Sequence, residues 1–308
     1  MSLESRIKAF DRLSSRFACE RQSPLISAYG IGKQNWEHLR IATMLYMSKC
    51  LPGEPIILDE EELLNRFEWT QNKMRNITPN GMIVPKRHLI LEYNLLVRAF
   101  MDIMQEMDIG DFVASWHIPL NLRFKASQVV KDNLKRQHAT ELIHTDAWAG
   151  ESPASVAVYI SILGDVERNR IVFYDPPPDF SEDWLRPLQA YRDGAPIAKR
   201  YKKTKIKQKQ GHVYLADFAT MHASTRFRGS GSRVSFDTTF TLKRSVEESQ
   251  MAEEKMHPWR KGERADYRTL CEIGKTKMFV FLDSMDVIRR GHFIHPTKLE
   301  IQELLPTK

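Results

Sequence analysis

Four segments rich in β-branched and aromatic residues, all between residues 111 and 242, constrain the fold most strongly. They read SVAVYISI, RIVFYD, GHVYLADF and SRVSFDTTFTL, and clusters of glycine, proline and aspartate separate them. Such segments are typical of short strands joined by turns. Several strands with few helical patterns between them predict an all-β core, and we expect a jelly-roll barrel, the double-stranded β-helix.

Helical patterns flank this core on both sides. Apolar residues recur at three- and four-residue spacing through most of residues 1–110. After residue 244 the segments SVEESQMAEEKM and TKMFVFLDSMDVIRR predict helices again. We therefore expect one domain over residues 1–308, in which helical regions at 1–110 and 245–308 brace a β core at 111–242.

The composition is that of a globular protein. Of its 308 residues, 42% are hydrophobic, which is enough for a sizeable core. No apolar run approaches the roughly 18 residues of a membrane span, and charged residues interrupt the first thirty, so we expect neither a membrane segment nor a secretory signal. Cys19, Cys50 and Cys271 are odd in number and widely spaced, which predicts free thiols and a cytoplasmic location.

Much of the net charge of +7 comes from one segment. Residues 199–209, KRYKKTKIKQK, hold seven basic side chains and no acidic one. The segment could be a solvated face, a strand whose Lys205, Lys207 and Lys209 protect a sheet edge, or a docking surface for an anion. It lacks the interleaved aromatic residues on which single-stranded nucleic acids stack, so nucleic acid is disfavoured as a partner.

The segment HTDAWAGESPASV places His144 and Asp146 two residues apart. On a strand such residues point to the same side and could grip one ion, although a strand histidine followed by a turn-forming aspartate would give the same letters. His222 follows the strand GHVYLADF and offers a third ligand. Two histidines and one carboxylate are the donor set of non-heme Fe(II) oxygenases, which keep other coordination positions open.

The last strand of the core has two chemically different faces. Its polar residues alternate with largely apolar ones, the polar set being Arg233, Ser235, Asp237, Thr239 and Thr241. The polar face lies either in water, as in an ordinary half-buried strand, or inside a barrel that holds a charged ligand. An arginine fork beside a serine hydroxyl suits a carboxylate.

Together these motifs resemble the Fe(II)/2-oxoglutarate-dependent oxygenases, in the phytanoyl-CoA-hydroxylase-like arrangement. The resemblance covers residues 144–240 and consists of His-x-Asp, a distal histidine and an Arg-x-Ser that begins eleven residues beyond it. It implies a double-stranded β-helix fold. It also implies that His144, Asp146 and His222 ligate and use Fe(II), and that Arg233, helped by Ser235, binds the distal carboxylate of 2-oxoglutarate.

The resemblance further implies the reaction. 2-Oxoglutarate and O₂ are consumed to give succinate and CO₂ while an unactivated C–H bond of the substrate is oxidised, by default to a hydroxyl group. Halogenating relatives have a small residue in place of the carboxylate ligand, so Asp146 argues against halogenation. Desaturation, epoxidation, ring closure and epimerisation stay open.

Other residues are weaker candidates. Trp148 would share the face of the metal ligands if the strand continued, and would then line the substrate pocket or lie in the core. Asn121 and Arg123 share a face of the strand in WHIPLNLRFK and could contact 2-oxoglutarate or form a plain polar face. Arg226 and Arg228 precede the last strand and could hold an anionic substrate or be solvated.

The substrate that we expect is a polar small molecule, anionic or carrier-linked, of the natural-product or carbohydrate type. Hydroxylation of a protein or nucleic acid is the nearest enzymatic alternative. A non-catalytic, cupin-like binding module that uses residues 199–209 is the alternative from another class. The helical regions exceed what one face of a barrel needs, so they could also supply a homodimer surface.

Overall fold

The structure is a computed structural model that describes residues 2–53, 55–74, 76–129, 134–243, 264–281, 288–289, 292–293 and 299–304. The helices are α1 (Leu3–Arg16), α2 (Lys33–Cys50), α3 (Glu60–Thr70), α4 (Ile90–Glu106), α5 (Ala195–Ala198) and α8 (Tyr267–Glu272). The strands are β1 (Glu20–Ser23), β2 (Ile26–Gly30), β3 (Val113–His117), β4 (Asn121–Lys125), β5 (Ser155–Gly164), β6 (Asn169–Asp175), β7 (Lys202–Lys203), β8 (His212–Asp217), β9 (Met221–Arg226), β10 (Arg233–Leu242), β11 (Arg264–Asp266), β12 (Lys277–Phe281), β13 (Ile288–Arg289), β14 (His292–Phe293) and β15 (Leu299–Glu303).

A large antiparallel sheet forms the centre of the molecule. Its strand order is β1-β2-β8-β5-β10-β3-β11, and β4 also pairs with β10. Strand β10 pairs with β5 along nearly its whole length, from Arg233 opposite Gly164 to Thr241 opposite Ser155. Every strand pair in this sheet is antiparallel, so the predicted mainly β, antiparallel core is confirmed.

A second, smaller sheet of order β7-β6-β9 packs against one face of the large sheet. Tyr159 of β5 and Tyr214 of β8 lie in one apolar cluster with Ile171 and Phe173 of β6. Two antiparallel sheets therefore face each other across a shared core. Closure of the two sheets into a jelly-roll barrel stays a prediction.

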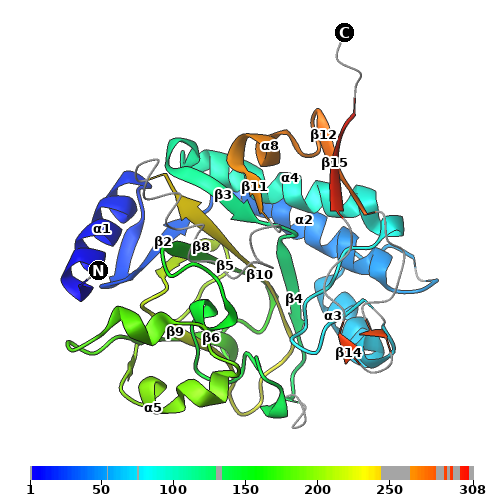
Figure 1. The fold of residues 1–308 in the computed structure, drawn as a ribbon. Coiled ribbons are helices and arrows are strands. Elements are labelled where there is room, and N and C mark those ends of the chain that lie inside the picture. Colours follow the sequence, from blue (N-terminus) through cyan, green and yellow to red (C-terminus); the bar gives the residue numbers. More distant parts are fainter. Residues whose placement is uncertain are drawn as a thin grey trace.

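Helices cover the opposite face of the large sheet, where α2 and α4 run side by side (Figure 1). The ring of Phe100 on α4 stacks on Phe236 of β10 with centroids 4.5 Å apart, and it meets Trp116 of β3 edge-on at 5.5 Å. The neighbouring residues of β10, Ser235 and Asp237, point to the other side, toward the small sheet. The polar face of β10 is therefore buried between the sheets and does not lie in water.

The first 110 residues are not helical throughout. A hairpin of β1 and β2 interrupts the helices, and β2 pairs with β8 to extend the large sheet. Ile26 and Ala28 alternate with Ser27 and bury their side chains in the core between the two sheets. Five residues are too few for a helical period to appear, so the hairpin is hidden between two strongly helical patterns.

The prediction of a helical region over residues 245–308 is wrong for much of its described part. Residues 244–263 lie outside the described residues, and α8 is helical, but Lys277–Phe281 forms β12, which pairs with β15. Phe279 and Phe281 pack on Tyr93 of α4 at 6.1 and 5.4 Å. The side chain of Asn94 accepts from the Phe279 amide at 2.7 Å and donates to its carbonyl at 2.9 Å. The amide group of Asn94 on α4 thus makes the two hydrogen bonds that the backbone of a neighbouring strand would make.

A buried ion network ties α1 to the sheets. The Arg6 guanidinium donates to Asp217 at 2.6 Å through Nη1 and to Glu182 at 2.5 Å through Nε. Asp217 ends β8, and its carboxylate also accepts from the amide of Ala219, at 2.7 Å, in the turn that leads into β9. The network therefore fixes the point at which the chain passes from the large sheet to the small one.

Replacing Arg6 should destabilise the fold strongly. In Arg6→Ala the buried Asp217 carboxylate loses its partner, which costs about 3–5 kcal/mol for a buried pair. Chemical denaturation measures this change in the free energy of unfolding. The control is Arg12→Ala, on the exposed side of the same helix, which should change it by less than about 0.5 kcal/mol. Equal effects of the two substitutions would contradict this account.

Candidate metal centre

A small cavity of about 30 Å³ lies between the two sheets. The side chains around it come from both sheets and from the segment before β5, and they are mostly polar: Arg123, Thr140, His144, Asp146, Tyr159, Ile171, His222, Ser224, Arg233, Ser235 and Asp237. Few apolar residues line it, so this is a place for charged ligands rather than part of the core.

His144, Asp146 and His222 meet in this cavity as the sequence predicted. One potential ligand atom of each residue lies within 4.8 Å of the others. A backbone bridge holds the two histidines together, because each amide donates to the carbonyl of the other, at 3.0 and 2.8 Å. The imidazole centroids are 4.2 Å apart, so one ion could contact both rings.

The backbone around His144 and Asp146 differs from the predicted strand. His144 makes an isolated bridge, and Asp146 begins a short 3₁₀ helix, η5 (Asp146–Ala149). Thr145 turns the chain: its hydroxyl accepts from the Ala147 amide and donates to the carbonyl of Phe218 at 3.0 Å. The two ligands therefore converge across a turn, not by strand alternation. His222 likewise lies within its own strand, β9, rather than just past the preceding one.

Because the strand does not continue, Trp148 does not line the cavity. Its side chain is fully buried, and its indole Nε1 donates to the carbonyl of Trp184 at 2.6 Å. Gly194 lies against the ring, since a Cβ at this position would be 2.2 Å from the indole carbon Cη2. The structure thus favours the core alternative, and the interpretation of Trp148 as a wall of the substrate pocket is wrong.

Both histidines are set up as neutral ligands. The Nδ1 of His144 lies 2.7 Å from the Leu142 carbonyl, which can only accept, so this nitrogen carries the proton and Nε2 has a free lone pair. That Nε2 is buried and has no hydrogen-bond partner. Burial, followed by repulsion from His222, lowers the pKa of His144 to about 3, and burial lowers the pKa of His222 to about 4. The residues present therefore fit a divalent metal ion.

Arg233 lines the same cavity as the triad. Its side chain is 1% exposed, and its Nε and Nη1 have no hydrogen-bond partner. Burial, followed by repulsion from Arg226, lowers its pKa to about 9. A buried guanidinium with unused donors indicates a site for an anion. Ser235, two residues along β10, also lines the cavity and is buried.

No motif in the sequence points to Lys125, which is buried beside this site. It lies directly opposite Arg233 in the pairing of β4 with β10, and its ammonium donates to the Thr140 hydroxyl at 2.8 Å. Burial lowers the pKa of Lys125 to about 7, while Glu141 at 3.4 Å opposes the shift. Lys125 and Arg233 occupy opposed positions of neighbouring strands, so the two cations repel each other, and Glu141 is the anion beside Lys125 that opposes this repulsion. Strand alternation places Lys125 on the face of Arg123, but the register that pairs it with Arg233 is not visible in the sequence.

Arg123 and Asn121 of β4 both act on Asp237. Arg123 donates to the two carboxylate oxygens at 2.5 and 3.0 Å, and Asn121 donates to one of them at 3.2 Å. Arg123 lines the cavity, and attraction to Asp237, although opposed by burial, raises its pKa. The two residues thus share the predicted face, but the partner that they bind here is a carboxylate of the protein.

The two arginines before β10 lie in different surroundings. Arg226 ends β9 and donates to the carbonyl of Ala126 at 2.6 Å and to Glu141 at 3.4 Å. With Lys125 and Glu141 it walls a neighbouring polar cavity of about 240 Å³ rather than the metal cavity. Arg228 is exposed on the loop that follows. A contact of either arginine with substrate stays a prediction.

The basic segment 199–209 forms a strand only at Lys202–Lys203, which is β7 at the edge of the small sheet. Beyond it Gln208 points inward, where its side-chain oxygen lies 3.3 Å from the Ser161 hydroxyl, while Lys205, Lys207 and Lys209 are exposed. The strand is therefore shorter than predicted, although the three lysines still point to solvent. Tyr201 is buried and offers no stacking surface.

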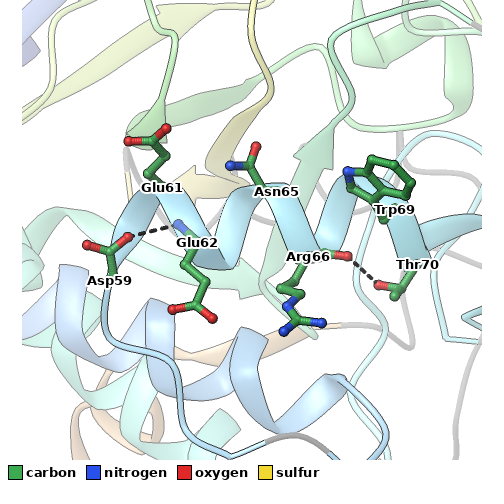
Figure 2. Close-up of a pocket in the computed structure, with 7 residues that line it drawn as sticks. All are labelled: Asp59, Glu61, Glu62, Asn65, Arg66, Trp69 and Thr70. Carbon is green, nitrogen blue, oxygen red and sulfur yellow. Dashed lines mark hydrogen bonds between the residues drawn. The ribbon is translucent and has the colours of Figure 1, made fainter.

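A larger hollow, of about 580 Å³, lies on the outer face of α3 and has a different character (Figure 2). Asp59 caps the helix by accepting from the Glu62 amide at 2.8 Å, and Trp69 at the other end is 84% exposed. The hollow is lined by one helix and its cap. It lacks the converging, buried donors that make the small cavity a candidate site.

Removing the ammonium of Lys125 should change how stability depends on pH. The pKa of Lys125 is about 7 in the folded protein and about 10.4 when unfolded, so the unfolded chain binds one more proton between these values. Its contribution to stability therefore rises with pH between about 7 and 10. The difference in the free energy of unfolding between wild type and Lys125→Met, measured by denaturant unfolding, should therefore rise with pH across this range. The control Lys199→Met, at an exposed position, should behave as wild type, and a Lys125→Met profile parallel to wild type would contradict the buried position.

Among the described residues, no helix is both long enough and apolar enough to cross a membrane. No family model matches the sequence, and no curated protein matches it.

The structure is similar to several solved structures. One is the non-heme alpha-ketoglutarate-dependent epimerase SnoN from nogalamycin biosynthesis, with 12% identity over 76% of this chain and 83% of that chain and a TM-score of 0.43. Another is AviO1 from Streptomyces viridochromogenes Tue57, with 14% identity over 75% and 94% and a TM-score of 0.42. A third is an N-substituted L-amino acid dioxygenase from Burkholderia ambifaria AMMD in complex with alpha-ketoglutarate, with 10% identity over 79% and 91% and a TM-score of 0.37.

Identities and TM-scores at this level carry no substrate or reaction across to this chain. The site itself agrees with the motifs. Two neutral histidines and a carboxylate converge between two antiparallel sheets, and a buried arginine with unused donors lines the same cavity. These features confirm the resemblance of the chain to the Fe(II)/2-oxoglutarate-dependent oxygenase superfamily.

Proposed function

We propose that the protein is a non-heme Fe(II)/2-oxoglutarate-dependent oxygenase. The observation that carries this proposal is the convergence of His144, Asp146 and His222 in one buried cavity, with the Nε2 of His144 lacking any hydrogen-bond partner. Two histidines and one carboxylate on one side of an ion leave its other positions open for a cosubstrate and O₂. When bound, the iron would supply the oxidative decarboxylation of 2-oxoglutarate that is coupled to oxidation of the substrate.

Arg233 in the lining of the cavity supports 2-oxoglutarate as the cosubstrate. The Nε and Nη1 of Arg233 have no partner, so the guanidinium has donors left for a carboxylate, and the Lys125 ammonium lies across the strand pair from it. A carboxylate there would relieve the repulsion between these two cations. Arg233 and the triad line one cavity, which supports a dicarboxylate held by both, and we assign Ser235 to the subsite of Arg233 because it lines that cavity too.

The roles of the other polar residues follow from their contacts. The Leu142 carbonyl fixes the proton on the Nδ1 of His144, which directs the Nε2 lone pair into the cavity. The phenol of Tyr159 lies 3.4 to 3.5 Å from the ring nitrogens of His222 and can orient that ring. The Arg123–Asp237 pair neutralises two charges beside His222, so neither is left to compete for the metal or the cosubstrate.

The opening of the cavity supports a polar substrate. The side chains of Arg123, Asp146 and Asp237 are 20%, 29% and 18% exposed, whereas those of His144 and Arg233 are almost fully buried. The partly exposed groups mark the side from which a substrate would approach, and all three are charged. We therefore propose hydroxylation of an unactivated C–H bond in a polar small molecule of the natural-product or carbohydrate type.

We also propose that residues 1–308 work as one oxygenase domain. One apolar cluster extends from Phe10 of α1 through α2 and α4 to Phe281 of β12, so helices α1 to α4 and α8 share a core with the large sheet. Such continuity is typical of a single folding unit. Whether two copies associate through the helices is answered by light scattering, where a strict monomer would exclude the homodimer.

The decisive experiment is anaerobic. Fe(II) and then 2-oxoglutarate are added to the purified protein, and we expect the weak visible charge-transfer band of iron-chelated 2-oxoglutarate. Arg233→Met should raise the dissociation constant for 2-oxoglutarate at least about 30-fold, because a buried charge pair loses about 2 kcal/mol or more when one partner is removed.

The matched control for this experiment is Arg228→Met, which removes an exposed arginine from the loop before the same strand and should leave the band unchanged. His222→Ala should abolish Fe(II) binding at equal protein concentration. If wild type gives no band while folded and iron-loaded, or if His222→Ala binds iron as well as wild type, the oxygenase assignment is wrong. A binding module that uses residues 199–209 would then be the better hypothesis.

A further inference from the structure

We propose that Tyr191 is a positioning residue that strengthens metal binding through His144. The proposal rests on the proposed function, because it assigns His144 as a metal ligand. Tyr191 lies in the connection between β6 and β7, 47 residues from His144, and no motif in the sequence points to it. The phenol ring stacks on the imidazole of His144, with centroids 4.0 Å apart and planes inclined by 21°.

The stack completes a cage around one imidazole. The Leu142 carbonyl fixes Nδ1 at 2.7 Å, the ring of His222 lies 4.2 Å away, and Tyr191 covers a face. His144 is fully buried as a result, and its Nε2 is the ring atom that points into the cavity without a partner. Any rotation of the imidazole about its Cβ–Cγ bond would have to displace the phenol.

Tyr191 is itself held in place by contacts that do not involve the metal cavity. Its amide donates to the carbonyl of Gln137 at 2.8 Å, and the preceding residue, Ala190, donates to the carboxylate of Asp193 at 3.0 Å. Three residues on, Gly194 sits against Trp148 with no room for a side chain. The segment around Tyr191 is therefore seated directly on η5, the 3₁₀ helix that begins with Asp146.

The stacked geometry has a chemical consequence. A metal ion bound at Nε2 withdraws electron density, so the imidazole of His144 becomes more positive when the ion binds. The face of a phenol ring is electron-rich and attracts a positive group stacked on it. Tyr191 should thus stabilise the metal-bound form more than the metal-free form. An attraction of this kind corresponds to roughly a threefold to thirtyfold change in the dissociation constant of the metal.

The phenol hydroxyl is not needed for this effect. Tyr191→Phe keeps the ring face and should bind metal within about twofold of wild type. Tyr191→Leu and Tyr191→Met remove the ring face, and methionine comes close to the length of the lost side chain while remaining flexible. Both should weaken metal binding by the factor given above.

The matched control is Tyr201→Leu. Tyr201 is another buried tyrosine of the same apolar cluster, but its ring packs on Trp184 and not on His144. Its replacement by leucine creates a comparable packing defect without touching His144. If the effect of Tyr191→Leu were only a loss of packing, Tyr201→Leu would weaken metal binding to a similar extent.

The experiment is an anaerobic titration of the metal-free, full-length protein with Co(II), followed by its visible d–d absorption, for wild type and the four variants. Weaker binding and an altered band in Tyr191→Leu or Tyr191→Met, with Tyr191→Phe and Tyr201→Leu near wild type, is the expected result. Unchanged binding in both ring-deleting variants, equal loss in Tyr201→Leu, or equal loss in Tyr191→Phe would each overturn the role of the ring face. If wild type fails to bind Co(II), the proposed metal centre itself falls, which the same titration reports separately.

Discussion

The pairing of β10 with its neighbours is the constraint on which the rest of the structure depends. Because alternate residues of a strand point to opposite sides, one strand supplies both Phe236, which packs on α4, and Arg233, which ends in the cavity. A slip of one residue would send the arginine into the helical layer and the phenylalanine into the cavity. The hydrophobic layer therefore fixes the register that the site requires.

Charge balance is the second organising principle of the site. Lys125, Arg226 and Arg233 are buried near one another, and Glu141 contacts two of them through a single carboxylate oxygen. Asp237 is already occupied by Arg123. Arg233, whose Nε and Nη1 have no hydrogen-bond partner, is thus left as an uncompensated cation in the lining of the metal cavity, while the triad offers neutral nitrogens and one carboxylate. The cavity can therefore hold a metal cation at the triad and an anion at Arg233.

The sequence predicted the chemistry of the site better than its architecture. The sequence pointed to His144, Asp146, His222 and Arg233 because the chemistry of a donor group depends on residue type and spacing, and both can be read from the sequence. The turn at Asp146 was missed because the side chain of Thr145 bonds to the distant Phe218 carbonyl, a tertiary contact. Lys125 and Tyr191 reach the site through cross-strand register and loop packing, and the strand Lys277–Phe281 depends on Asn94 of another element. None of these has a local signal.

The exposed lysines at the edge of the small sheet have a consequence for the molecule as a whole. Without the seven basic side chains of residues 199–209, the chain would carry 39 basic and 39 acidic residues, so this segment alone equals the whole formal charge. The excess positive charge of the chain is therefore equal to the charge of one exposed segment. At low ionic strength this segment attracts negatively charged surfaces, and added salt screens that attraction.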